Sequence, residues 1–546
     1  GTLSFYTEER DGFADNNPDP FGNFLAGEPS SDEFQDTETD AARVALLWDI
    51  TDSLAVGYTF DYSDVDATPR LGQLTQTSSN SWLYSGGLQD PYITKDDERE
   101  ENGSNDWAFE EASETESHTL DITWRGDNIA LRSLTSYRDL DWDDVIDIDG
   151  TAIDIFHSER HIDYDSFSQE LQLTGSYDKL DYVVGLYYFE EEADVFNPIS
   201  FFSFAGVPTG ENSYGLDNDS IAAYGQVDWR PGMFDNRMTV TLGVRWTEEE
   251  KDQYVVHPGI YDEQADDTFD NTSPAVALSW AFTDDINGYV RYAEGWKSGG
   301  FNSEGQTAEE FLNGYKDEEV ASYEVGLKSL LLDGRLKLNA AAFYNEFDDY
   351  QISVFEGAAA ASLVVNIPEY ETSGFELEAV ALVTENLQFN LAYGYLDTEY
   401  KDFPKDFDFF SKNEAGTPYS PENSLTLGMD WTIARTGYGN WDLHVDYSYL
   451  DDYVPYIDPD QNRASQIDDR SLVNARLALS EIELGGGMLQ FALWGQNLTD
   501  EDYRINTIPF GGVDQRVDPN GGSGVGWTTS YFGEPRTYGV ELTYSF

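Results

Sequence analysis

Apolar and polar residues alternate along most of this chain. The segment "TVTLGVRWT" at 239–247 puts Val, Leu, Val and Trp on one parity and Thr, Gly and Arg on the other. The closing segment "RTYGVELTYSF" at 536–546 has the same pattern. Side chains of an extended strand alternate between two faces, so each such segment has one apolar and one polar face. Helical periodicity is nearly absent, and the pattern therefore predicts an all-β protein.

About twenty segments carry this alternation. Most have ten or more residues, which exceeds the ~5–6 residues of an ordinary soluble strand and matches the ~9–11 of a tilted membrane strand. The predicted strands are 2–10, 40–50, 52–63, 115–126, 128–139, 161–176, 179–191, 219–230, 237–251, 272–283, 286–297, 318–331, 335–350, 372–384, 386–399, 422–433, 438–452, 469–481, 487–499 and 536–546.

The connections between these segments alternate between short and long. Tight turns are predicted at 126–128, 283–285, 333–334 and 385–386, and long polar loops at 64–114, 192–218, 298–317 and 500–535. Outer-membrane barrels place short turns at one end and long loops at the other. Lipid offers no partner to free backbone groups, so the strands should close into a ring. We therefore predict one domain over 1–546, a transmembrane antiparallel up-and-down β-barrel.

Composition narrows the possible partners. The 546 residues include 105 Asp and Glu against 30 Lys and Arg, which argues against binding to nucleic acid. Cysteine is absent, so neither disulfides nor thiolate metal sites are expected. No run of 18 apolar residues exists to form a membrane helix. The chain starts at Gly1 without Met, and we expect it to be a processed or partial product.

Several longer segments resemble one family, the TonB-dependent outer-membrane receptors. They are "SLAVGYTFDYSDVDATP" at 53–69, "YVRYAEGWKSGGFN" at 289–302, "YNEFDDYQISVF" at 344–355, "SGFELEA" at 373–379, "WGQNLTDEDY" at 494–503 and the closing "RTYGVELTYSF". The resemblance implies a barrel of 22 strands around an N-terminal plug. The first strand here looks like the family's third, so the plug, the TonB-contacting box and two strands are expected to precede Gly1.

The resemblance also implies a function. It is TonB-driven uptake of a scarce, bulky solute across the bacterial outer membrane, with a ferric siderophore as the default solute. Vitamin B12, haem or an oligosaccharide are alternative solutes. No enzymatic activity, cofactor or metal site is expected. A passive porin and a surface structural or adhesion barrel remain the alternatives from other classes.

The implied partners are the TonB complex, the small-molecule solute, lipopolysaccharide and lipid of the outer membrane, and the barrel-assembly machinery. In the family, a last strand that ends in an aromatic residue is recognised during assembly. That role is expected here for Tyr544 and Phe546.

Charged residues on the polar parity should face the lumen, because charge on the lipid face costs ~2–4 kcal/mol at the midplane. Pairing with carboxylates of the plug or of neighbouring strands is the favoured role. Substrate contact is predicted for Lys297, beside the loop "SGGFN", and for Arg291 and Trp296. Outward tryptophans near strand ends are predicted to lie at the membrane interface. The luminal cations are Arg125, Arg245, Arg291, Lys297, Lys328 and Arg476, and the outward tryptophans are Trp124, Trp229, Trp246 and Trp431.

Two segments invite a metal-binding interpretation. In "DVIDIDGTAIDIF" at 144–156, Asp147 and Asp149 fit a calcium loop, but Val145 and Phe156 occupy positions that need carboxylates. His157 and His161 lie four apart in "HSERH", a spacing that does not direct two rings of a strand to one metal. We favour a solvated loop without a metal. The acidic stretch 90–116 is predicted to be a solvated surface loop, with divalent cations or a cationic ligand as the alternative.

Overall fold

The structure is a computed structural model. It describes residues 1–16, 31–77, 98–103, 105, 109–152, 154–202, 207, 209–232, 234–356, 361–404, 412–510 and 527–546. The predicted acidic loop at 90–116 therefore lies outside the described residues up to residue 97 and at 104 and 106–108, and its last residues belong to a strand.

Each predicted strand corresponds to one strand of a 20-stranded antiparallel sheet. The strands are β1 (Thr2–Arg10), β4 (Thr37–Thr51), β5 (Leu54–Ala67), β8 (Glu110–Arg125), β9 (Ile129–Asp147), β10 (Phe156–Tyr177), β11 (Leu180–Phe201), β12 (Gly210–Trp229), β13 (Met238–His257), β14 (Tyr261–Ala281), β15 (Ile286–Lys297), β16 (Glu318–Leu331), β17 (Leu336–Glu356), β18 (Ala361–Thr384), β19 (Leu387–Asp402), β20 (Asn423–Thr436), β21 (Gly439–Leu450), β22 (Arg470–Leu484), β23 (Gly487–Gln496) and β26 (Thr537–Ser545).

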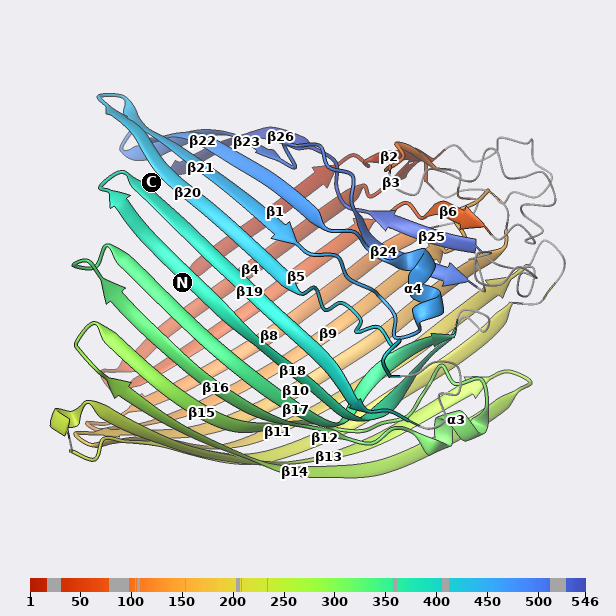
Figure 1. The fold of residues 1–546 in the computed structure, drawn as a ribbon, viewed down its shortest axis with the longest axis horizontal. Helices are drawn as coiled ribbons and strands as arrows, with labels where there is room; N and C mark the ends of the chain where they lie inside the picture. Colours follow the sequence, from red (N-terminus) through yellow and green to blue (C-terminus); the bar gives the residue numbers. More distant parts are fainter. Residues whose placement is uncertain are drawn as a thin grey trace.

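Each of these strands pairs with its neighbour along the chain, as β16 does with β15 and β17. Figure 1 shows the sheet curled into a barrel, with tight turns at the left end and the long connections at the right end. We call the end with the long connections the mouth. Among the described residues, no helix is long and apolar enough to cross a membrane.

The prediction of a closed ring is wrong for the described residues. β1 pairs with β4 and β26 pairs with β23, but no backbone pairing joins β1 to β26 in the part of the chain that the structure describes. Both edges expose large apolar side chains, with Phe5 77% and Val540 69% exposed. The barrel therefore has an open seam between its first and last strands.

Several strands continue toward the mouth well beyond their predicted ends. The segment 192–218, predicted as a loop, is largely strand, because β11 runs to Phe201 and β12 begins at Gly210. β13 and β14 similarly extend to a short hairpin at residues 257–261. In these extensions acidic residues replace apolar ones on the outward parity, for example Asp217 and Asp252. The two-residue period persists there, but its apolar signal is lost.

The described hydrophobic core lies in the mouth rather than in the barrel wall. β6 (Gln73–Thr77) pairs with β25 (Trp527–Phe532), which also pairs with β24 (Arg504–Phe510). Leu74, Phe156, Phe510 and Trp527 are buried in one cluster beneath this three-stranded mouth sheet. Loops from opposite sides of the open seam are thereby joined at the mouth.

Smaller elements complete the mouth. They are a second small sheet of β2 (Ala14–Asn16), β3 (Glu33–Phe34) and β7 (Asn102–Gly103) and the helices α3 (Ala308–Asn313) and α4 (Pro459–Ser465). The 3₁₀ turn η2 (Phe234–Asn236) lies at the opposite end, in the connection between β12 and β13. Thr307 and Glu310 form a capping box that fixes the start of α3. None of these elements was predicted from the alternation, because they are too short to show it.

Candidate functional site

A cavity of about 390 Å³ lies inside the mouth. Its walls are the inner faces of β10 to β13 at their mouth ends, the loop that carries Ser303 to Gln306, the tip of the β17–β18 hairpin and β24. A volume of ~300–1,000 Å³ is typical of small-molecule sites. The cavity is therefore large enough to hold a small ligand or part of a bulky one.

One side of the cavity is apolar. Ile148, Ile199, Phe355 and Phe510 line it. Phe510 is held by a stacked Trp527, with ring centroids 4.8 Å apart, and by an edge contact from Phe355 at 5.7 Å. This apolar surface is continuous with the buried core of the mouth, so its shape depends on the mouth sheet.

The polar side carries a single ion pair. Arg160 Nη2 lies 3.6 Å from Glu304 Oε1, and Glu304 Oε2 accepts a hydrogen bond of 3.0 Å from the Ser362 backbone amide. Glu304 thus bridges β10 and β18 from a loop that belongs to neither. Among the lining residues that the structure describes, Arg160 and Glu304 are the charged ones, together with the titratable His257.

The loop that carries Glu304 is fixed against the hairpin tip of β13 and β14. His257 Nε2 lies 3.3 Å from the Ser303 carbonyl, and Tyr261 donates to the Gly305 carbonyl. Burial lowers the pKa of His257, which favours the neutral imidazole. Asn302 pairs with the Val364 backbone at 2.8 and 3.1 Å. These contacts hold one wall of the cavity in place.

A second hollow of about 720 Å³ lies deeper, along β11 to β15. Its lining includes Arg245, Lys251, Glu249 and Trp296. Arg245 lies over the rings of Tyr187 and Tyr224, at 5.6 and 5.7 Å from their centroids. Lys251 Nζ donates to the Gly299 carbonyl at 2.9 Å and so reaches the loop beside the mouth cavity.

Two of the predicted luminal cations contact neighbouring side chains of the wall. Arg476 pairs with Glu541 at 2.6 Å, which matches the favoured pairing with a carboxylate of a nearby strand. Lys328 lies over the Tyr289 ring at 5.5 Å. These side chains support the wall.

The three residues predicted to contact substrate are not brought together. Trp296 donates to Asp317 at 3.0 Å, and Lys297 lies opposite Glu318 in the β15–β16 register. Arg291 lies six residues earlier on β15, opposite Glu324, a distance of about 20 Å along a strand. None of the three lines the mouth cavity. Arg160 and Glu304 were missed because the predicted strand began at 161 and Glu304 lay in a predicted loop.

The interpretation of 144–156 as a solvated loop is wrong. Asp147, Asp149 and His157 are buried, and their ligand-type atoms lie within 4.8 Å of one another. Both oxygens of Asp149 accept hydrogen bonds within the loop, from Thr151 at 2.9 and 2.6 Å and from the Phe156 amide at 2.8 Å. These hydrogen bonds therefore stabilise the conformation of the loop. The carboxylates are buried because the mouth sheet, whose strands lie far away in the sequence, covers them.

His161 lies apart from this cluster and pairs with Asp143. The two histidines of "HSERH" therefore lie beside different carboxylates, as expected from their spacing.

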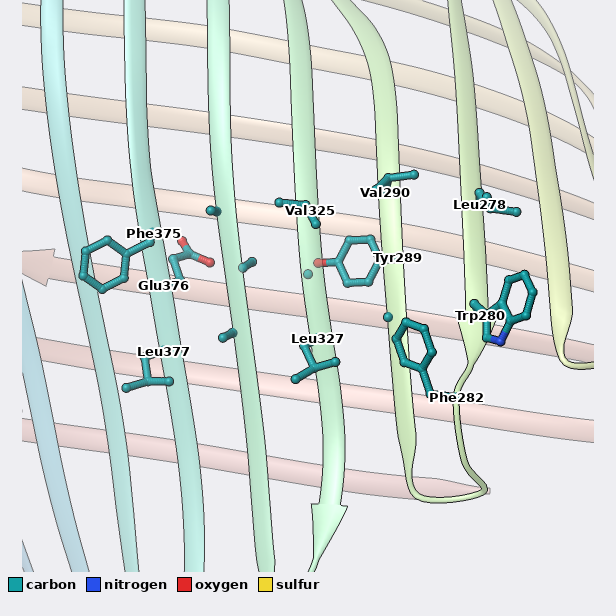
Figure 2. Close-up of a pocket in the computed structure, with 15 residues that line it drawn as sticks. Leu278, Trp280, Phe282, Tyr289, Val290, Val325, Leu327, Phe375, Glu376 and Leu377 are labelled. Atoms are coloured by element: carbon teal, nitrogen blue, oxygen red, sulfur yellow. The ribbon is translucent and has the colours of Figure 1, made fainter.

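The outer face of the barrel carries a different hollow, of about 700 Å³. Figure 2 shows Trp280 and Phe282 beside the tight turn after β14, with Phe375 and Leu377 on the far side. Between them the small residues Gly288, Ala340 and Ala342 leave the groove open. Its lining is almost entirely apolar, as suits a surface in contact with lipid.

Tyrosines mark the end of this apolar face that lies nearest the mouth. On strands that run toward the mouth, outward tyrosines donate to the carboxylate two residues farther on, at 2.9 Å for Tyr188 and Glu190 and at 3.0 Å for Tyr449 and Asp451. Beyond this level acidic residues face one another across neighbouring strands. One such row is Glu116, Asp139, Asp165, Glu192, Asp217, Asp252 and Asp266.

The predicted outward tryptophans are exposed on the same barrel. The exposed set includes Trp124, Trp229, Trp246 and Trp431.

Comparison with known proteins shows to which family the chain belongs. The family model "TonB dependent receptor-like, beta-barrel" matches residues 48–498. The chain belongs to this family, whose barrel is of the bacterial outer-membrane type and whose members bind TonB and small solutes. The family is one of receptors rather than enzymes.

Individual relatives are distant. The chain is 22% identical over 424 residues to the ferric-pyoverdine M114 receptor PbuA of Pseudomonas sp., covering 71% of this chain and 49% of that protein. It is 26% identical over 168 residues to the pesticin receptor of Yersinia enterocolitica, covering 30% and 23%. The chain thus spans between about a quarter and about a half of these curated relatives.

Solved structures share the fold. The ferric yersiniabactin uptake receptor FyuA from Yersinia pestis superposes with a TM-score of 0.76 at 17% identity, covering all of this chain and 75% of that chain. The siderophore receptor PiuA from Acinetobacter baumannii gives 0.71 at 16% identity, covering 96% and 76%.

Proposed function

We propose that this chain is the barrel of an outer-membrane receptor that takes up a ferric siderophore or similar iron complex, driven by the TonB complex. The observation that carries the proposal is the family match over 48–498, on a 20-stranded sheet with a ligand-sized cavity in its mouth. The names of relatives, among them a ferric-pyoverdine receptor and the ferrioxamine B receptor of Salmonella typhimurium, support iron complexes over vitamin B12, haem or oligosaccharide.

We further propose that two additional strands fill the seam between β1 and β26, with a plug ahead of them. Open strand edges cannot face lipid, because each unpaired backbone group there costs several kcal/mol. The unpaired edges of β1 and β26 support this completion. The TonB-contacting box would precede the plug.

The mouth is proposed to face outward from the cell, with lipopolysaccharide around its rim. Arg291, Lys297 and Trp296 stay proposed substrate contacts along the deeper path, supported for Trp296 by its place in the second hollow. Uptake assays on Lys297→Gln, with the paired wall residue Arg476→Gln as control, would test this assignment.

Uptake itself is tested in the source bacterium. Deletion of the gene should abolish uptake of ⁵⁵Fe-labelled siderophore under iron limitation, and the full-length gene should restore it. Loss of TonB should have the same effect as deletion. Uptake that persists without TonB would favour a passive porin, and deletion without any uptake phenotype would favour an adhesion or structural barrel.

The terminal aromatic residues are proposed as the signal for the barrel-assembly machinery. Phe546 is fully exposed, and Tyr544 donates to the Leu484 carbonyl at 3.1 Å. Deletion of Phe546 should lower the amount of folded receptor in the membrane without changing the ligand affinity of the folded fraction. Normal surface levels would refute this role.

A further inference from the structure

The charges of the mouth cavity bear on the kind of iron complex it accepts. Among the described residues that line it there is one permanent cation, Arg160, which lies 3.6 Å from the carboxylate of Glu304. A second carboxylate, Asp144, lies directly opposite Arg160 in the β9–β10 register. The guanidinium is thus matched by two acidic neighbours, and the described part of the lining offers no excess of positive charge.

The uncharged lining suits a different kind of ligand. Asn197, Asn212 and Tyr214 supply amide and hydroxyl groups, and Ile199 and Phe510 supply apolar surface. Such a wall can hold a chelate by apolar contact and neutral hydrogen bonds. A chelate with several negative charges would instead require unpaired Arg or Lys side chains to replace its hydration.

The surroundings of the cavity reinforce this selection. The chain carries a formal net charge of −75, and clefts in a field of one sign repel ligands of that sign. Near the mouth, rows of carboxylates on the outer face of the wall, such as Asp165, Glu192 and Asp217, add to this negative field.

From these contacts we infer that the mouth cavity accepts an uncharged or positively charged ferric chelate with apolar arms and excludes polyanionic chelates. This inference rests on the proposed function and adds the charge class of the substrate. Ferric trihydroxamates belong to the accepted class, because three singly charged ligands cancel the charge of Fe³⁺. Ferric tricatecholates, which retain three negative charges, belong to the excluded class.

Glu304 is the residue that sets this preference. Replacing it with Gln keeps an oxygen that can accept from the Ser362 amide but removes the charge that offsets Arg160. The variant should therefore gain affinity for an anionic chelate. Replacing Arg160 with Gln should have the opposite effect on the anionic chelate and leave an uncharged one unaffected.

The experiment uses the full-length receptor in detergent micelles and follows tryptophan fluorescence during titration with ferrioxamine E, which is uncharged, and with ferric enterobactin, a tricatecholate. We expect the wild type to bind ferrioxamine E at least about tenfold more tightly. Glu304→Gln should raise the affinity for ferric enterobactin about tenfold, the effect of one charge-assisted hydrogen bond. Glu309→Gln, an exposed neutralisation on α3 in the same loop, is the matched control.

The outcomes separate the inference from the proposed function. Binding of neither probe to folded wild-type receptor would overturn both. Equal affinity of the wild type for the two probes would overturn the inference alone. The inference also fails if folded Glu304→Gln changes the ratio of the two affinities no more than Glu309→Gln does.

Discussion

The mouth cavity and the outer groove differ in the medium that they face. The groove around Gly288 and Ala340 is the roomier, at about 700 Å³ against about 390 Å³ for the mouth cavity. It is nonetheless a packing gap on a lipid-facing wall, formed where small residues lie among large ones. The smaller cavity combines an apolar side with an ion pair and amide groups. Space alone therefore does not identify a site, and the surrounding medium decides what a hollow can bind.

The mouth cavity depends on a core that the outer groove lacks. Trp527→Ala should remove the ring that stacks on Phe510, a truncation that typically costs ~3–5 kcal/mol in a core. Because the barrel wall folds through its own pairing, the loss should appear as local opening of the mouth sheet. Hydrogen exchange of β6 and β24 should accelerate while the thermal unfolding of the barrel stays unchanged. Tyr438→Ala, an exposed aromatic in a tight turn, is the control. An equal drop in barrel stability would show that mouth and wall are one unit.

Placing a charge at each of two adjacent residues of β17 tests which face of the strand contacts lipid. Ala340 and Ala341 both line the outer groove, but they have opposite strand parity. Ala340 lies opposite Leu327 on the outward parity, whereas Ala341 lies opposite Gly326 and Glu376 on the inward parity. Ala340→Arg should destabilise the barrel by ~2–4 kcal/mol in lipid. Ala341→Arg should cost far less, because its charge reaches the lumen. Urea unfolding in liposomes measures both, and equal costs would refute the assignment of faces.

The acidic rows near the mouth predict a smaller effect. Asp165 lies opposite Asp139 and Glu192, and like charges on neighbouring strands repel one another. Asp165→Asn should raise stability by ~0.2–1 kcal/mol at low salt, and the gain should shrink as salt screens the repulsion. Asp127→Asn, in an exposed tight turn, should have no such salt-dependent effect. A destabilised Asp165→Asn variant would contradict the repulsion.

The smallest effect concerns pH at the loop beside the cavity. His257 stacks on Tyr261 and has a pKa lowered by burial, opposed by the Ser303 carbonyl and by Glu304. In the unfolded chain the imidazole of His257 has a pKa of about 6.5 and therefore binds a proton more readily than it does in the folded protein. Docking of the loop is therefore fully stable above that pH and weakens as pH falls toward the folded pKa. Proteolysis between residues 298 and 317 should increase below about pH 6.5, and His257→Gln should abolish this dependence. Cleavage that does not change with pH would argue against this role of His257 in docking the loop.

The local pattern was sufficient to predict which segments form strands and which parity faces lipid. Arg245 and Trp246 were assigned to opposite faces of β13 from alternation alone, and Arg245 lines the inner hollow while Trp246 is exposed. Strand ends were predicted less well, since the apolar signal fades where β11 and β12 leave the membrane and carry acidic outward residues. The candidate site was largely missed, because Arg160 and Glu304 are far apart in the chain and neither has a distinctive neighbour.

The sequence by itself determined the twenty strands, their faces and the family, because a two-residue period is a local property that each segment carries independently. Only the tertiary structure decided the pairing of β6 with β25 and the burial of Asp147, Asp149 and His157. These features depend on contacts between segments that lie hundreds of residues apart. Such contacts form only once the sheet has curled and brought its two edges to one mouth.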